Sequence, residues 1–353
     1  MRKYQRKTAY LWSGLILSAM LFMLWGCDAK ENNESTQSKQ STQARENNKK
    51  PLTLAVIPKS TGGEFWQTVE AGARKAANDL GVEIKWEGTL TETEIAEQNK
   101  IIENMINLGV DGIALAPLNA KAMSKRVQDA VQANIPVVIF DSAVDGDAYS
   151  SFVATDNVQG GKLGAEYVIQ QLNDKLGSGK GKIVVLRYVQ GTASTEARAQ
   201  GFLDAVKQAG LEIVADVYPE DGSVAGAKKT AANTLEGLIH DNKLDVDGIF
   251  ACNLVSALGM AAALNDLRKS GIAVDSIFVG FDSSEKLIKE LNDGSINALV
   301  VQNPHKMGYL AVETLVKHLR GEKIETRVDT GVEVVTKDKL QQDPAIRKLV
   351  GVE

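Results

Sequence analysis

The chain has 353 residues, which is enough for about two domains. Its hydrophobic fraction of 44% and charged fraction of 24% are those of an ordinary soluble globular protein. A net charge of -5 argues against nucleic-acid binding as its main task, because proteins that bind phosphate backbones usually carry a basic excess. Two cysteines and three histidines argue against a zinc site. We expect no metal and no cofactor.

The first 27 residues predict a lipoprotein signal peptide. A basic start precedes an apolar stretch at residues 11–25, which is short for a membrane span but typical of a signal peptide. The stretch ends in Leu-Trp-Gly-Cys, which resembles a bacterial lipobox, although Trp25 is larger than usual there. Cleavage would leave Cys27 as a lipidated N-terminus that anchors the chain outside the cytoplasm. The alternative is an uncleaved anchor with an incidental cysteine.

Residues 28–50 are almost entirely polar or charged, which predicts a disordered tether. From residue 52 onward, short apolar runs rich in β-formers alternate with segments of helical periodicity. We expect strands at residues 52–57, 82–86, 112–116, 136–140, 152–154, 182–187, 212–218, 248–251, 277–281, 298–302 and 332–336. We expect helices from residue 64 and at residues 92–107, 120–133, 157–176, 193–209, 224–240, 256–270, 285–293 and 307–320, before a charged tail. Repeated β-α units predict two α/β halves with doubly wound parallel sheets.

The first β-loop-α unit holds the first candidate for a binding site. An apolar strand is followed by a loop with Lys59 and Gly63, and then by Phe65 and Trp66 at the start of a helix. In an open α/β sheet, ligands bind at the carboxyl ends of the strands. Phe65 and Trp66 are therefore candidates for ligand contact, and an equally good interpretation makes them core residues.

Polar side chains follow four other expected strands at the point where each strand ends. These residues are Asp141, Asn253, Asp282 and Gln302. Any one of them could instead cap the next turn or helix, but four together favour a shared polar site at the ligand edge of the sheets. Arg198, on an expected helix, is a weaker candidate because an arginine on a helix is usually solvated.

The sequence shows no motif typical of catalysis. It lacks a Gly-x-Ser-x-Gly elbow. The Gly/Lys-rich segment at residues 177–182 lacks the spacing of a phosphate-binding loop and lies after a helix instead of before one. We therefore expect a binding protein and not an enzyme.

Several segments together resemble the ribose-type periplasmic binding proteins, the sugar-capturing subunits of ABC importers. They are AVIPKSTGGEFWQTVEAGA, VDGIALAPLNA, IPVVIFDS, VATDNVQGGKLGAEYV, GTASTEARAQGF, VDGIFACNLVSALGMAAAL, VGFD and VQNPHKMGYLAVE. The resemblance implies two Rossmann-like lobes joined by a three-crossing hinge, with the ligand between them. The N-terminal lobe would comprise residues 51–155 and 303–331, and the C-terminal lobe residues 156–302 and 332–353.

The resemblance also implies roles for individual residues. Phe65 and Trp66 correspond to an aromatic pair that packs on the apolar face of a sugar. Asp141 corresponds to a carboxylate, and Arg198 to an arginine, that bind sugar hydroxyls. The remaining predicted contacts are Asn253, Asp282 and Gln302.

Three predicted site residues depart from the ribose binders. Ser142 stands where those proteins carry an arginine, and Lys59 and Gly63 replace a serine and an asparagine in the first loop. The resemblance therefore predicts the scaffold but not ribose as the ligand. We expect Lys59 to face the solvent, and the alternative is that it binds an acidic or phosphorylated ligand.

Together these features predict a monomeric, lipid-anchored solute receptor that closes on a sugar or sugar-like molecule. The resemblance implies delivery to the permease of an ABC importer. The alternative from the same fold is a receptor that presents its ligand to a membrane sensor kinase or chemoreceptor. Neither function involves nucleic acid.

Overall fold

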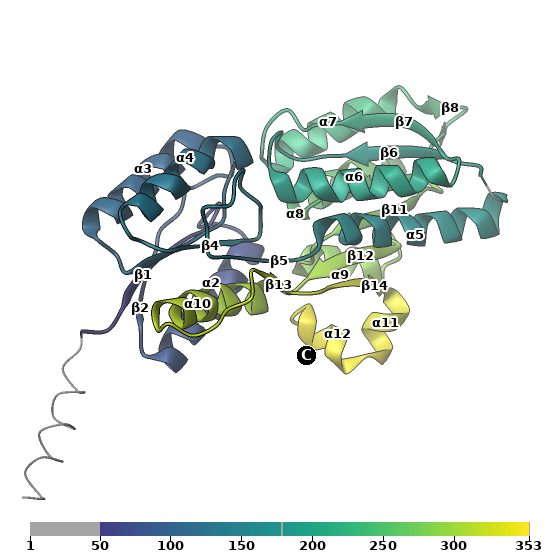
Figure 1. Cartoon of the computed structure of the whole chain (residues 1–353). Coiled ribbons are helices and arrows are strands. Elements are labelled where there is room, and N and C mark those ends of the chain that lie inside the picture. The colour runs from purple at the N-terminus through teal and green to yellow at the C-terminus, as the bar shows by residue number, and fades with distance from the viewer. Residues whose placement is uncertain (1–49, 178, 353) are drawn as a thin grey trace, which may run out of the picture. The chain divides into compact units, whose positions relative to one another are not determined.

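The computed structural model describes residues 50–177 and 179–352 (Figure 1). The predicted signal peptide, Cys27 and all but the last residue of the predicted tether lie outside this part. Residues 51–353 form one compact unit. Within the described ranges, none of the helices has the length and apolar character that crossing a membrane requires.

The first sheet is parallel throughout. It contains β1 (Thr53–Ile57), β2 (Glu83–Trp86), β3 (Gly112–Leu115), β4 (Val137–Phe140), β5 (Ser151–Ala154) and β13 (Arg327–Asp329), in the order β13-β5-β4-β3-β1-β2. Its helices are α2 (Glu64–Leu80), α3 (Ile95–Leu108), α4 (Ala120–Gln132) and α10 (Pro304–Leu319). Because side chains alternate along a strand, Leu54 and Val56 of β1 pack with α2 and α10, whereas Ala55 and Ile57 pack with α3 and α4. Figure 1 shows these helix pairs on opposite faces.

The second sheet has a matching strand order but one antiparallel edge strand. It contains β6 (Lys182–Leu186), β7 (Glu212–Val217), β10 (Gly248–Ala251), β11 (Ile277–Phe281), β12 (Ala298–Gln302) and β14 (Val332–Thr336), in the order β14-β12-β11-β10-β6-β7, with β14 antiparallel to β12. Its helices are α5 (Asn157–Leu176), α6 (Ala193–Gln208), α7 (Val224–Glu236), α8 (Leu254–Lys269) and α9 (Glu285–Asn292). Val184 and Leu186 pack with α7 and α8, and Ile183 and Val185 with α5 and α6.

The chain passes from one sheet to the other three times, after β5, after β12 and after β13. The predicted fold class is therefore confirmed: two doubly wound α/β lobes are joined by three crossings. In each sheet the first strand lies between the second and third, so the carboxyl ends of β1 and β3, and of β6 and β10, flank a topological switch point where ligands bind in such folds. We call the elements around these sheets the first and second lobes.

One predicted helix is wrong in its last four residues. The helix expected at residues 224–240 ends at Glu236 and is followed by a small hairpin of β8 (Ile239–His240) and β9 (Lys243–Leu244). Asp241 and Asn242 both have positive φ values, of 49° and 57°, as a tight hairpin turn requires. Asp and Asn tolerate this conformation better than most residues, so the turn prevails over the helical pattern.

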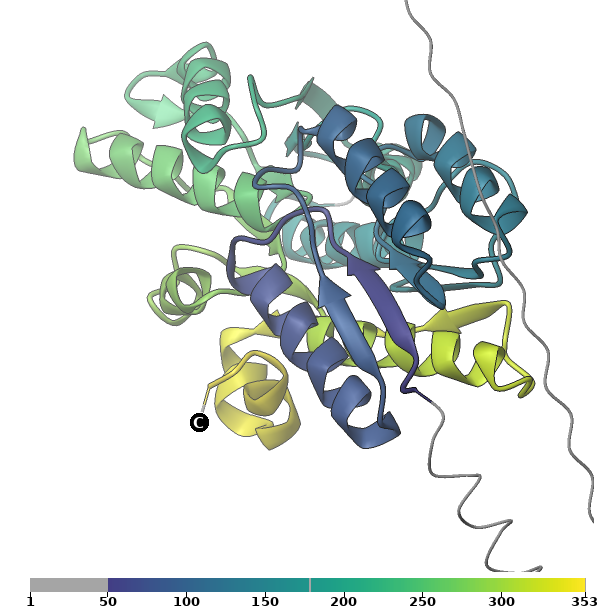
Figure 2. The same cartoon turned by 90° about the vertical axis from the view of Figure 1, so that its left-hand side faces the viewer.

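The charged tail also has more structure than expected. It forms α11 (Lys337–Gln342) and α12 (Pro344–Leu349), which are capped by the side chains of Thr336 and Asp343. Leu340 and Ile346 are buried against the second lobe. Figure 2 shows these C-terminal helices beside α2, with which α12 shares the lining of a cavity.

Glycine allows α5 and α6 to pack closely, and this contact positions Arg198. A Cβ atom at Gly161 would lie 1.9 Å from the Arg198 carbonyl oxygen, which belongs to the backbone and has little room to move. We expect Gly161→Ala to lower the free energy of unfolding by about 2–3 kcal/mol, as measured by urea denaturation. Gly237→Ala is the control, because the nearest atom there is 3.9 Å away. Equal stability of the two variants would contradict the packing argument.

Candidate functional site

A cavity of about 580 Å³ lies where the strands of both lobes end, within the size range of small-molecule sites. Both lobes contribute to its lining. Nine of the ten predicted site residues line it: Lys59, Gly63, Phe65, Trp66, Asp141, Arg198, Asn253, Asp282 and Gln302. The carboxyl ends of strands in both sheets therefore border this cavity.

The aromatic pair belongs both to the core and to the cavity. Trp66 is only 4% exposed and packs in the first-lobe core, with its ring edge-on to Phe65 at 5.0 Å and to Phe140 at 6.4 Å between centroids. Phe65 is half-buried. The two interpretations of these residues are thus compatible, because core packing holds the rings that form one wall of the cavity.

Lys59 and Asp141 form a buried ion pair. Asp141 directly follows β4, and its Oδ2 lies 2.6 Å from the Lys59 Nζ, with both side chains less than 5% exposed. The Lys59 ammonium also donates a hydrogen bond to Ser194 Oγ of the second lobe. The interpretation of Lys59 as solvent-facing is therefore wrong. Asp141 has a φ of 60°, a left-handed conformation that non-glycine residues rarely adopt and that is common at functional sites.

Ser142 is the one predicted site residue that does not line the cavity. It is fully buried, and its Oγ accepts a hydrogen bond of 3.1 Å from the Ser194 backbone N–H. This bond connects the end of β4 in the first lobe to the start of α6 in the second. A direct contact of Ser142 with a ligand stays a prediction.

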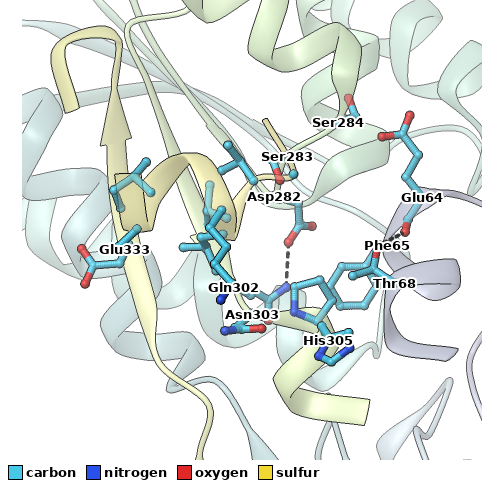
Figure 3. A pocket seen from close by; sticks show the side chains of 18 of the residues that line it. Glu64, Phe65, Thr68, Asp282, Ser283, Ser284, Gln302, Asn303, His305 and Glu333 are labelled. Atoms are coloured by element: carbon cyan, nitrogen blue, oxygen red, sulfur yellow. Dashed lines mark hydrogen bonds between the residues drawn. The ribbon is translucent and has the colours of Figure 1, made fainter. Parts of the chain in front are cut away.

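Three second-lobe strand ends meet around Asp282. The Gln302 Nε2 donates to Asp282 Oδ1 at 2.7 Å (Figure 3), and the Leu254 N–H donates to Oδ2 at 3.0 Å. Asn253 caps α8 by accepting from the Ser256 N–H, so the capping interpretation is confirmed for this residue, which still lines the cavity. Burial raises the pKa of Asp282 because it disfavours the charged carboxylate, and Arg198 opposes this shift. Like Asp141, Asp282 has a left-handed φ, of 69°.

Arg198 is buried and held from several sides, so the solvated interpretation is wrong. Only 2% of the residue is exposed. Its Nε donates to Asn157 Oδ1 at 2.8 Å, and its Nη1 donates to the Cys252 carbonyl at 3.2 Å. Its guanidinium lies 3.9 Å from the Phe281 ring centroid, a cation–π contact, and Nη1 lies 3.9 Å from Asp282 Oδ2. These contacts fix the orientation of the guanidinium within the cavity wall.

Sequence reasoning missed several lining residues, among them Glu92, Tyr188 and Ser194. Tyr188 is 2% exposed and its hydroxyl donates to the Gly222 carbonyl at 3.2 Å. It comes just after β6, so the strand-end argument applied to β6 would have found it. Glu92 lies in the irregular segment before α3, which begins at Ile95 and not at residue 92 as expected. No sequence pattern marks it.

A second cavity, of about 730 Å³, shares part of its lining with the first. Both are lined by Phe65, Asp282 and Gln302, whereas Glu64 and His305 line only the second. Figure 3 shows Asp282 and Gln302 pointing toward each other in this wall, with Glu64 on the α2 side. A substitution at Glu64 therefore distinguishes effects on the second cavity from effects on the first.

Neither metal binding nor thiol chemistry is supported among the described residues. Among residues 50–177 and 179–352, no cluster of His, Cys, Asp and Glu side chains is arranged to hold a metal ion. Burial raises the pKa of the Cys252 thiol to about 12, so the thiol stays protonated at neutral pH and is a poor nucleophile.

Comparisons with known proteins give the family. The model of the periplasmic binding protein domain matches residues 54–323. The chain belongs to the periplasmic binding protein family. This binding protein is 30% identical to the ribose import binding protein of Escherichia coli (strain K12) over 291 residues, which cover 81% of the chain and 90% of the relative. The ribose-type resemblance is thus confirmed.

Two solved structures of sugar-binding relatives are similar to this periplasmic binding protein. The ABC transporter solute binding protein from Agrobacterium vitis with bound D-fucose is 38% identical, with a TM-score of 0.77, and the match covers 84% of the present chain and 99% of the other. The carbohydrate transporter solute binding protein from Agrobacterium radiobacter in complex with D-arabinose is 35% identical, with a TM-score of 0.78. The match covers 85% of the present chain and 99% of the other.

Proposed function

We propose that the protein captures a sugar or sugar-like small molecule in the cavity between its lobes, outside the cytoplasm, and delivers it to the permease of an ABC importer. The observation that carries this proposal is the composition of one cavity. An aromatic wall of Phe65 and Trp66 faces the same space as Asp141, Arg198 and Asp282. Aromatic rings pack on the C–H face of a sugar, while charged groups bind its hydroxyls.

The relatives support the same class of ligand. Two proteins of this fold that share more than a third of their residues with the chain hold D-fucose and D-arabinose. Hydrogen bonds also connect the lobes around the cavity, from Lys59 to Ser194 and from the Thr192 hydroxyl to the Leu118 carbonyl. A ligand that contacts both lobes would shift the population toward this closed arrangement.

The test is a thermal-shift panel with D-ribose, D-allose, D-arabinose and D-fucose, followed by calorimetry on the sugar with the largest shift. We expect at least one sugar to raise the melting temperature in a concentration-dependent way. The delivery step is tested by adding the loaded protein to a permease reconstituted with its ATPase. No binding by any sugar of the panel would overturn the proposal.

From the N-terminal sequence we also propose that the protein is anchored to the membrane by acyl chains on Cys27. We expect the full chain, expressed in a bacterial host, to incorporate labelled fatty acid. Cys27→Ser should abolish the label, and Cys252→Ser, at the buried second cysteine, should keep it. Label that persists in the Cys27 variant would contradict the anchor.

A further inference from the structure

Glu92 faces the cavity and is held in place by the aromatic wall. The Trp66 Nε1–H donates a hydrogen bond of 2.7 Å to Glu92 Oε1. Trp66 is fixed by the first-lobe core, so the indole restricts where the carboxylate can lie. Glu92 lines the cavity together with Lys59, Asp141 and Arg198. It is therefore a positioned carboxylate and not a mobile surface side chain.

Both cations of the cavity lining already have partners. Lys59 pairs with Asp141 at 2.6 Å. Arg198 lies 3.9 Å from Asp282 and is further held by a side-chain oxygen, a backbone carbonyl and an aromatic ring. Within the described part of the chain, no lysine or arginine lies within 4.0 Å of the Glu92 carboxylate.

The cavity lining consequently contains more carboxyl groups than basic groups. Its two buried cations face three carboxylates, Asp141, Asp282 and Glu92, and the exposed Asp221 adds a fourth. Burial raises the pKa of Glu92, and the nearby Asp141 and Asp282 carboxylates raise it further, whereas Lys59 and the Trp66 hydrogen bond lower it. A ligand that donates a hydrogen bond or carries positive charge would stabilise the Glu92 carboxylate, whereas an anion would find no unpaired cation in this lining.

We infer that Glu92 is a specificity-determining residue, which accepts a hydrogen bond from a hydroxyl or ammonium group of the ligand and excludes sugar acids and sugar phosphates. This inference rests on the proposed function and narrows its ligand class to neutral or amino sugars. It also argues against the alternative that Lys59 binds an acidic or phosphorylated ligand, because Asp141 already pairs with the Lys59 ammonium. In a site of low dielectric constant, an anion without a free cation is strongly disfavoured.

The test compares matched sugars by calorimetry on the wild type and on Glu92→Gln. D-fucose and D-ribose are the neutral probes, D-galacturonate and D-ribose 5-phosphate their anionic counterparts, and D-galactosamine the cationic one. We expect the wild type to bind each anion at least about 100-fold more weakly than its neutral counterpart. Glu92→Gln should lower the affinity for the best-bound neutral sugar about 10-fold. It should also reduce the ratio between the affinity for that sugar and the affinity for its anionic counterpart. Glu92→Gln should lower the affinity for D-galactosamine by a larger factor than the affinity for the neutral sugar.

Glu87→Gln is the charge-matched control, because Glu87 is exposed and does not line the cavity. The amide introduced by Glu92→Gln keeps an acceptor for the Trp66 indole, and a melting temperature equal to or above that of the wild type shows that the variant folds. Anion affinity equal to that of the neutral sugar, or a Glu92→Gln protein that binds all probes within two-fold of the wild type, would overturn the inference alone. A wild type that binds no sugar would overturn the proposed function, and the inference with it.

Discussion

Asp282→Asn is expected to weaken sugar binding about 100-fold without destabilising the empty protein at pH 7. In the wild type, Asp282 offers a carboxylate to the cavity, and an amide there presents an N–H where sugar hydroxyls need an acceptor. The fold should tolerate the change, because Asn adopts the left-handed φ of 69° at this position readily. Gln302 can also rotate its amide, since its Oε1 is buried and makes no hydrogen bond to a described residue.

The same variant tests the raised pKa of Asp282. The folded-state pKa lies above the ordinary value of 3.8, so the folded state favours the protonated carboxyl. The corresponding stabilisation is complete below the ordinary pKa and is lost as the pH rises through the folded-state pKa. Asparagine does not titrate. Urea denaturation from about pH 4 to pH 8 should therefore show the variant gaining stability relative to the wild type as the pH rises.

Glu64→Gln is the control for this prediction, because Glu64 lines the second cavity but not the first. It should bind sugar as the wild type does. An Asp282→Asn protein with unchanged affinity would remove Asp282 from the binding site, and a stability difference independent of pH would contradict the raised pKa.

Lys59→Met is expected to lower the free energy of unfolding by about 3–5 kcal/mol, the usual cost of removing one partner of a buried ion pair. Asp141 is 3% exposed, and its Oδ2 has the Lys59 ammonium as its contact at 2.6 Å. Methionine matches the length of the lysine stem, so the loss comes from the unpaired carboxylate and not from a void. Urea denaturation at pH 7 measures the effect.

The double variant Lys59→Met/Asp141→Asn should recover most of that stability, because it removes the remaining charge as well. Lys85→Met, at an exposed lysine of β2, should differ little from the wild type. If Lys59→Met is as stable as Lys85→Met, the ion pair does not stabilise the contact between the segments after β1 and β4 in solution.

Much of the fold was predictable because its elements are locally encoded. The central strands of both sheets are short runs buried on both faces. The helix α5 was predicted with its observed bounds, Asn157–Leu176. The errors arose where local signals compete. The hairpin after Glu236 depends on two residues in the left-handed region, and β13 is too short for its periodicity to be recognised. The C-terminal helices depend on apolar contacts with the second lobe.

The candidate site was likewise predictable in its local features but not in its long-range contacts. Strand ends and the first aromatic pair were identifiable because, in a parallel sheet, position along the chain predicts position at the ligand edge. The sequence by itself determined two α/β lobes and the edge that bears most of the cavity. Only the tertiary structure decided that Lys59 pairs with Asp141, that Arg198 is buried and that Glu92 contacts Trp66. These contacts form between segments that are far apart in the sequence and become buried together on folding. Hydrophobic periodicity and local turn chemistry describe only neighbouring residues, so they do not predict such contacts.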